Sequence, residues 1–235
     1  METKQQYRKM VLDDYDLDEH ELYLKYPQHH KWWNKLYLAE TMGYSCGPGG
    51  VRIPSTGEYV IRPIYNLIGM GVCTTIKTLK QDDCTSTPPG YFWCEYLEGN
   101  HYSATYENVN GSWNPLHCWQ GWNSKTNVVK FSKWIRSDYT PTMPDAIASI
   151  NNVKYINIEY KGDNPIELHF RPSGNPDGTS VSTWNEYIPI WHDTTQFEKD
   201  KLADRGYTWI DNPYDDWMED MEPYLTERRL GYYVR

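Results

Sequence analysis

The chain has 235 residues, of which 39% are hydrophobic, and its 23 basic and 32 acidic side chains give a net charge of -9. This acidic balance disfavours the broad contact with a phosphate backbone that DNA-binding proteins make, and no apolar stretch approaches the roughly 20 residues of a membrane span. The first ten residues carry cations without an apolar run behind them, and the five cysteines include no C-x-x-C pair. We therefore expect a cytoplasmic protein with reduced thiols, with neither nucleic acid nor a membrane as its main partner.

The first hundred residues predict helices followed by paired strands. Asp16 or Asp18 is a suitable N-cap for a helical entry, and apolar residues at helical spacing predict a helix from His29 that stops at Gly43. Segments rich in β-branched and aromatic residues predict strands at 58–65, 72–79 and 91–97. The first two strands are expected to form a hairpin around a glycine-containing loop at 66–71.

The rest of the chain predicts further antiparallel strands and short helices. After a break at 98–100, Asn110-Gly111 supplies a hairpin turn. The expected elements are strands at 101–107, 155–160 and 166–170 and helices at 144–150 and 194–205. Together they predict an α+β fold with two small lobes, mainly antiparallel sheets and flanking helices.

Two neighbouring strands carry the side chains best suited to chemistry. Side chains alternate between the faces of a strand, so Glu167, His169 and Arg171 share one face, as do Asn157 and Glu159. Carboxylates bind Mg²⁺, and the planar guanidinium of arginine binds phosphate. This pattern predicts a site for a metal and a polyphosphate, although a solvent-facing strand with ion pairs remains an alternative.

A second candidate is Arg62, which lies just before Gly69-Met70-Gly71. A cation beside the backbone N–H groups of a glycine-rich loop can bind an anion. A simple hairpin turn explains the same glycines.

The order of these motifs resembles that of the ATP-grasp superfamily of carboxylate–amine ligases. In chain order the matching residues are Asn34-Lys35, Arg62-Pro63, Gly69-Met70-Gly71, Glu95-Tyr-Leu-Glu-Gly99, Glu159 and Glu167-Leu-His169-Phe-Arg171. The resemblance covers about 31–171 and implies an ATP-dependent ligase. In such an enzyme a carboxylate attacks the γ-phosphate of ATP, and an amine or similar nucleophile then displaces phosphate from the acyl phosphate.

The resemblance also implies a division of the chain and a set of site residues. It divides the chain into an N-terminal helical extension (1–30), a first lobe with the helix, glycine loop and hinge (31–100), a second lobe with the metal and phosphate strands (101–175), and a C-terminal extension packed on the lobes (176–235). The implied cofactors are ATP and Mg²⁺, with Mn²⁺ as an alternative metal, and the partners are an unidentified carboxylate and amine. The catalytic cations would be Arg62 and Arg171; the ATP-binding residues Arg62, Gly69, Met70, Gly71, Lys77, Glu95, Tyr96, Leu97 and Glu98; and the metal ligands Glu159, Glu167 and His169. Lys130 is the alternative to Lys77 as a second phosphate lysine.

Two other functions remain open. The chain has Arg62 where the family usually has lysine, His101 where an acid is common, and His169 where asparagine is usual, and these departures predict a non-catalytic scaffold with the same fold. The aromatic rings of Tyr91, Trp113, Trp119 and Trp122 predict instead a glycan-binding or virion-type module. The compact size and the Trp- and Tyr-rich composition resemble phage-encoded proteins, which would place the chain in a host cytoplasm.

Overall fold

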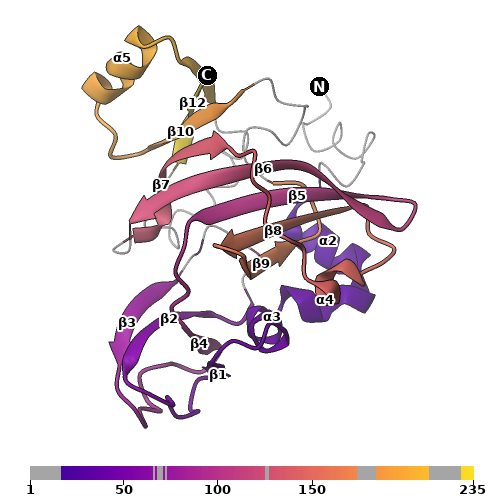
Figure 1. The fold of residues 1–235 in the computed structure, drawn as a ribbon. Helices are drawn as coiled ribbons and strands as arrows, with labels where there is room; N and C mark the ends of the chain where they lie inside the picture. The colour runs from indigo at the N-terminus through magenta and orange to yellow at the C-terminus, as the bar shows by residue number, and fades with distance from the viewer. Residues whose placement is uncertain are drawn as a thin grey trace, which may run out of the picture.

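The computed structural model describes residues 17–65, 67, 71, 73–124, 127–173, 184–211 and 229–235, which form two sheets and several short helices (Figure 1). Sheet A contains β1 (Cys46–Pro48), β2 (Gly57–Pro63), β3 (Thr75–Leu79) and β4 (Tyr91–Glu95), in the order β1-β4-β2-β3. Sheet B contains β5 (His101–Val109), β6 (Ser112–Ser124), β7 (Asn127–Arg136), β8 (Tyr155–Lys161), β9 (Asn164–His169), β10 (Glu186–Trp191), β11 (Thr208–Asp211) and β12 (Arg229–Val234), in the order β11-β12-β10-β7-β6-β5-β8-β9. The helices are α2 (Glu19–Lys25), the 3-10 helix η1 (Pro27–Trp33), α3 (Lys35–Thr41), α4 (Asp145–Ala148) and α5 (Gln196–Asp204).

The described strands pair antiparallel throughout, which confirms the expected α+β fold with two mainly antiparallel sheets. The hairpin of β2 and β3 and that of β8 and β9 are present as predicted. Asn110 and Gly111 form the turn between β5 and β6, both with positive φ. None of the helices in the described part of the chain has the length and apolar character needed to span a membrane.

The helix expected from His29 is divided into two. The side chain of Asn34 accepts a hydrogen bond from the backbone N–H of Tyr37 and caps a new helix, so η1 ends and α3 begins at this residue. Gly43 adopts φ +77° and ends the helical segment, as predicted. Further upstream, Asp18 caps α2 in a reciprocal arrangement with Glu21.

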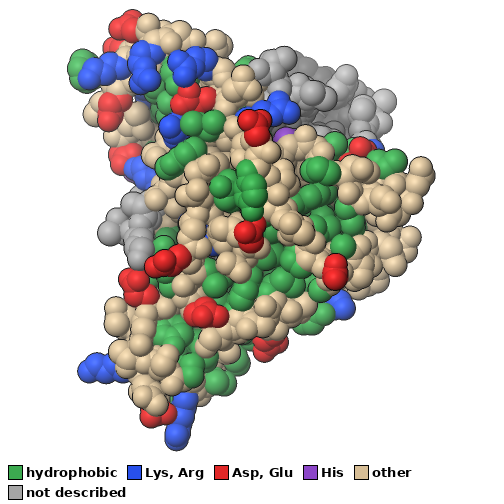
Figure 2. Space-filling model, viewed as in Figure 1, with side chains coloured by type: hydrophobic (Ala, Val, Ile, Leu, Met, Phe, Trp, Pro, Cys, Tyr) green, Lys and Arg blue, Asp and Glu red, His purple; other side chains and the backbone are tan. Residues whose placement is uncertain are grey.

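Sheet B is larger than the sequence predicts, because it includes β6 and β7 and also β10, β11 and β12 near the C-terminus. The last three strands extend the sheet beyond β7, so the C-terminal part of the chain adds strands to it as well as the helix α5 (Figure 1). Figure 2 shows basic side chains gathered at the end of the molecule where α5 lies, with apolar side chains across the centre of the same view.

The main core lies between one face of sheet B and the helices. Alternate residues of β5 and β8, including Ala104, Ile156 and Ile158, pack with Leu22 of α2 and Ile147 of α4. In sheet A, α3 covers one face through a cluster that contains Ala39, Phe92 and Cys94. Helix α3 also contacts β9, so the two sheets meet around this helix.

The two sheets are linked by residues 96–100, which we call the hinge, and the hinge packs directly against the turn between β8 and β9. A Cβ atom added to Gly99 would lie 2.7 Å from the backbone nitrogen of Gly162 and 2.8 Å from its Cα. Gly162 in turn donates a backbone hydrogen bond to Asn100. Only glycine permits this approach of two backbones at φ +119°.

We therefore expect Gly99→Ala to lower the free energy of unfolding by about 2–4 kcal/mol, because the new methyl group meets backbone atoms that cannot rotate away. The matched control is Gly111→Ala, where φ is also positive but nothing lies within 4 Å of the added Cβ, so that the loss should be only about 1 kcal/mol. Urea unfolding of the two variants measures the difference. Equal losses would contradict the close contact.

Candidate functional site

The predicted acids of sheet B lie on one face of neighbouring strands. Glu159 of β8 is the cross-strand partner of Glu167 in β9 and of Ser103 in β5. Asn157 is the partner of His169 in the same way. Directly opposite residues of an antiparallel pair point to the same side, so the three predicted metal ligands are neighbours.

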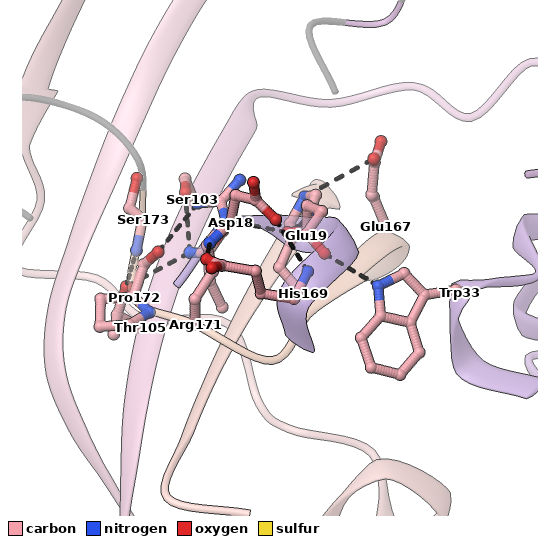
Figure 3. Close-up of polar contacts among 12 residues, drawn as sticks. Asp18, Glu19, Trp33, Ser103, Thr105, Glu167, His169, Arg171, Pro172 and Ser173 are labelled. Atoms are coloured by element: carbon pink, nitrogen blue, oxygen red, sulfur yellow. Dashed lines mark hydrogen bonds and ion pairs between the residues drawn. The ribbon is translucent and has the colours of Figure 1, made fainter. Parts of the chain in front are cut away.

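A buried carboxylate from α2 joins this group (Figure 3). The Oε1 atom of Glu19 lies 2.6 Å from Nδ1 of His169 and 2.9 Å from Nε of Arg171, and Oε2 accepts a hydrogen bond of 2.8 Å from Nε1 of Trp33. Burial alone would raise the pKa of Glu19. The charges of His169 and Arg171 and the hydrogen bonds from His169 and Trp33 outweigh it and lower the pKa to about 2.

Lys35, the first residue of α3, forms the second buried ion pair. Its Nζ atom lies 2.6 Å from Oε1 of Glu167, and both side chains are almost completely buried. Nε2 of His169 lies 3.5 Å from the same carboxylate oxygen. Burial acts to lower the pKa of His169, but the carboxylates of Glu19 and Glu167 on its two sides outweigh it and raise that pKa above its ordinary value.

Glu159 faces a third cation candidate, His101, at the start of β5. Nε2 of His101 lies 3.4 Å from Oε2 of Glu159, and neither imidazole nitrogen has a hydrogen-bond partner among the described residues. Burial would raise the pKa of Glu159. Contact with His101 and the charges of His169 and Lys35 hold that pKa below its usual value. The Glu159 side chain remains 29% exposed, which makes it the most accessible acid of the group.

Arg62 of β2 connects sheet A with β9, the strand that carries Glu167 and His169. Its guanidinium lies over the ring of Phe92, 5.2 Å from the ring centre, and Nη2 donates a hydrogen bond of 2.7 Å to the carbonyl oxygen of Ile166 in β9. Ile166 is the residue before Glu167. The Nε atom of Arg62 is buried and has no hydrogen-bond partner within the described ranges. One donor of the guanidinium therefore remains unsatisfied among the described residues.

The predicted metal ligands do not fit a metal ion in this ion-paired arrangement. The described residues contain no group of three His, Cys, Asp or Glu side chains that could hold one. Although Glu159, Glu167 and His169 are adjacent, Lys35 neutralises Glu167, and Glu19 contacts Nδ1 of His169. A metal ligand must offer a free lone pair, whereas these side chains are already engaged with charged partners of the same chain.

The remaining predicted ATP-binding residues lie in sheet A and in the link to sheet B. Glu95 ends β4 and accepts a hydrogen bond from the backbone N–H of Ser45, and the hinge residues that follow it become progressively more exposed towards Glu98. Lys77 of β3 is the cross-strand partner of Tyr59 and is exposed. It therefore lies on the opposite face of sheet A from Arg62.

Four further predicted residues lie partly outside the described ranges or in another part of the fold. Gly71 has φ +59° in the turn before β3, whereas Gly69 and Met70 lie outside the described residues. The alternative lysine, Lys130, pairs with Asp193 and lies against Trp191 on the far part of sheet B.

The four aromatic rings that motivated a glycan-binding module do not form an exposed platform. Trp119 is 1% exposed, within a cluster of buried rings. Tyr91, Trp113 and Trp122 are half-buried, and Nζ of Lys133 lies over Trp122, 4.6 Å from the ring centre. Stacking of a sugar requires an open ring face, so these four rings give little support to that function.

Sequence reasoning assigned no role to Glu19 or to Lys35. The signal for Glu19 is its spacing, because it precedes the fully buried Leu22 by three residues and so shares the inward face of α2. An acid on an apolar helical stripe needs a buried cation, and His169 and Arg171 supply it from sequence positions far away.

The comparison with known proteins identifies similar solved structures, whereas no family model and no curated protein sequence matches the chain. An N5-carboxyaminoimidazole synthetase from Staphylococcus aureus, solved with ADP, is similar with a TM-score of 0.59 and 11% identity, over 94% of this chain and 74% of that one. The carboxyaminoimidazole ribonucleotide synthase from Aspergillus clavatus, solved with ATP, has a TM-score of 0.52 and 7% identity, over 94% and 74% of the two chains. An L-amino acid ligase from Bacillus licheniformis has a TM-score of 0.50 and 10% identity, over 88% and 66%.

The chain is shorter than these proteins, and it spans 60% of a protein from Archaeoglobus fulgidus assigned to the ATP-grasp superfamily, at a TM-score of 0.44. At identities of 7–11% the three similarities above concern the fold alone. They agree with the arrangement described here, in which a small antiparallel sheet and a large one meet around α3 and are joined by a short hinge. The chain therefore has the ATP-grasp fold.

Proposed function

We propose that this chain binds ATP where the two sheets meet and acts as an ATP-dependent ligase. In the proposed reaction a substrate carboxylate attacks the γ-phosphate of ATP and releases ADP, and an amine or similar nucleophile then displaces phosphate from the acyl phosphate. The adenine would lie against the end of β4 and the hinge, at Glu95, Tyr96, Leu97 and Glu98, and the glycine loop that contains Gly69, Met70 and Gly71 would cover the phosphates. Lys77 lies on the opposite face of sheet A from Arg62 and would take no part in this site.

The observation that carries the proposal is the contact between Arg62 of sheet A and Ile166 of β9, immediately before Glu167. Through this contact Arg62, the cation of sheet A that matches the family pattern, lies against the strand of sheet B that carries Glu167. Lys35 arrives at the same acids from α3. Two of the similar structures were solved with ADP or ATP, which supports a nucleotide as the ligand of this fold.

The chain's own cations can bind the phosphates by exchange of partners. Arg62 has an unsatisfied Nε–H group, and Lys35 and Arg171 are bound to carboxylates. A phosphate oxygen is an equally good acceptor for a guanidinium or an ammonium group, so Lys35 and Arg171 could leave their carboxylates for a phosphate while His169 stays within 3.5 Å of both Glu19 and Glu167. Phosphoryl transfer depends chiefly on positioning and neutralisation of charge, which these three cations would provide.

Isothermal titration calorimetry with ATP tests the proposed site. We expect wild-type protein to bind ATP and Arg62→Gln to bind it about 10-fold more weakly or worse, because a charged hydrogen bond to phosphate is lost. Lys80→Ala, which changes an exposed lysine after β3, is the control and should leave the affinity unchanged. Arg171→Gln provides a second test if the first variant is poorly folded. Absence of ATP binding by the wild-type chain would refute the proposal.

A specific observation favours a second function, that of a non-catalytic scaffold with the ATP-grasp fold. All three acids of the buried group face cationic or imidazole side chains of the same chain, and the described residues assemble no metal site. Release of phosphate from ATP separates the two functions. A ligase-type enzyme supplied with ATP, a carboxylate and an amine should release phosphate in a reaction that Arg62→Gln abolishes, whereas a scaffold should release none above the level of that variant.

A further inference from the structure

Two cysteines face each other across sheet A. Cys46 of β1 and Cys94 of β4 are direct cross-strand partners in the antiparallel register. Both belong to the cluster that packs under α3, so their side chains lie on the same face. We propose that Cys46 and Cys94 form a reversible intramolecular disulfide, and that this pair is an oxidation site of the protein.

The hydrogen-bond pattern places the pair where two strands approach most closely. The backbone N–H of Glu95 donates to the carbonyl of Ser45, and that of Gly49 donates to the carbonyl of Tyr91. Hydrogen-bonded and non-hydrogen-bonded pairs alternate along an antiparallel ladder, so Cys46 and Cys94 form a non-hydrogen-bonded pair between these two positions. The Cα atoms of such pairs are about 4.5 Å apart, inside the range of about 4.4–6.8 Å that disulfides occupy. The bond can therefore form without a change of register.

The two thiols differ in access, and burial raises the pKa of both. Cys46 is half-buried, whereas Cys94 is 4% exposed. Burial, with a contribution from Glu40 and Glu95, raises the pKa of the Cys46 thiol to about 11. Burial also raises the pKa of Cys94 to about 12, although the Arg62 charge acts in the opposite direction. The thiolate is the attacking species, so oxidation should be slow at neutral pH and faster in mild alkali.

Because Cys46 is the more accessible thiol, it should react first with a small disulfide such as oxidised glutathione. The Cys46 thiolate attacks a sulfur of glutathione disulfide, which forms a mixed disulfide and expels one glutathione thiolate. Cys94 then loses its proton and attacks the sulfur of Cys46, which forms the Cys46–Cys94 bond and expels the second glutathione. The two cysteines are oxidised by two electrons in total, and one glutathione disulfide is reduced to two thiols.

The Cys46–Cys94 disulfide would stabilise the end of sheet A that leads to the hinge. β1 is an edge strand of three residues, and among the described strands it pairs with β4 alone. β4 ends at Glu95, whose carboxylate already accepts a hydrogen bond from Ser45. Oxidation would add a covalent link between these two strands, two residues before the hinge begins. The inference concerns the thiols alone and is independent of nucleotide binding.

Peptide mapping of the oxidised full-length protein tests the inference. The folded chain is incubated with oxidised glutathione at about pH 8.5, where thiolates are more abundant, then alkylated and digested without reduction. We expect a linked pair of peptides that contain Cys46 and Cys94, loss of alkylation at both residues, and recovery of both after treatment with dithiothreitol. Cys118→Ser should leave the linkage intact, because Cys118 lies in β6 of the other sheet, whereas Cys46→Ser should abolish it.

Other outcomes would overturn the inference. One is continued alkylation of both Cys46 and Cys94 in the folded protein while the exposed Cys73 and Cys84 accept glutathione. Another is a mixed disulfide that stops at Cys46 and never transfers to Cys94. Cys46 is half-buried at an edge strand, so that Cys46→Ser retains the fold and the test does not depend on the more deeply buried Cys94→Ser.

Discussion

Glu19→Ala is expected to lower the free energy of unfolding by about 3–5 kcal/mol, the range observed when one partner of a buried ion pair is removed. The substitution leaves His169 and Arg171 without their shared carboxylate, and it leaves the indole N–H of Trp33 without its acceptor. Buried charges and donors without partners are more costly than the original pair was favourable.

A matched control lies two residues away in the same helix. Glu21 is exposed and, within the described ranges, bonds to the cap residue Asp18, so Glu21→Ala should cost about 1 kcal/mol. Both variants are measured by urea unfolding under the same conditions. A loss for Glu19→Ala no larger than that for Glu21→Ala would show that the carboxylate of Glu19 does not hold His169 and Arg171 together.

The free energy of unfolding is expected to fall strongly at acidic pH because of the carboxylate of Glu19. The pKa of Glu19 falls from its ordinary value of 4.5 to about 2 in the folded state, so the unfolded chain takes up the proton first as the pH is lowered. The contribution of Glu19 is therefore fully present above about pH 4.5 and is lost as the pH falls towards 2. The shift corresponds to about 3 kcal/mol.

His169 has the opposite dependence. Its pKa is raised above the ordinary value of 6.5, so its contribution is present below that pH and is lost as the pH rises through the folded-state pKa. Unfolding by urea over a series of pH values measures both effects in wild type, Glu19→Gln and the control Glu21→Gln. The stability difference between wild type and Glu19→Gln should shrink as the pH falls below 4.5, whereas Glu21→Gln should retain the wild-type acid dependence. An acid dependence in Glu19→Gln as steep as that of wild type would contradict the assignment.

The elements that the sequence predicts well are those that local chemistry specifies. Asn110-Gly111 favours a tight hairpin turn wherever it occurs, and the structure has that turn between β5 and β6. The strands 155–160 and 166–170 alternate strongly and are separated by a glycine-containing turn, and they form the hairpin of β8 and β9. In each case residues that are neighbours in the sequence determine the local structure.

The long strand β6 was not predicted, because irregularities interrupt its alternation. Its register against β5 shifts near Pro115, and its register against β7 shifts near Asn123. A bulge inserts an extra residue and exchanges the two faces of a strand, so a period of two is not maintained along the sequence. Proline is also uncommon within strands away from such bulges.

The candidate site was predicted only in part for a similar reason. The alternation of β8 and β9 correctly places Glu159, Glu167 and His169 on one face. The sequence does not indicate that Lys35 binds the carboxylate of Glu167 or that Glu19 binds the imidazole of His169. Those contacts join residues more than a hundred positions apart. Whether side chains that share a face are available to a ligand depends on tertiary packing, which strand periodicity does not determine.

The most direct test of the proposed nucleotide site is a crystal structure of the protein with a non-hydrolysable ATP analogue at saturating concentration. The proposal predicts the adenine against Glu95–Glu98 and the phosphates within hydrogen-bond distance of Arg62, with Lys35 or Arg171 moved from its carboxylate onto a phosphate oxygen. A nucleotide bound elsewhere on the molecule, or crystals that contain none while Lys35 stays on Glu167, would contradict it.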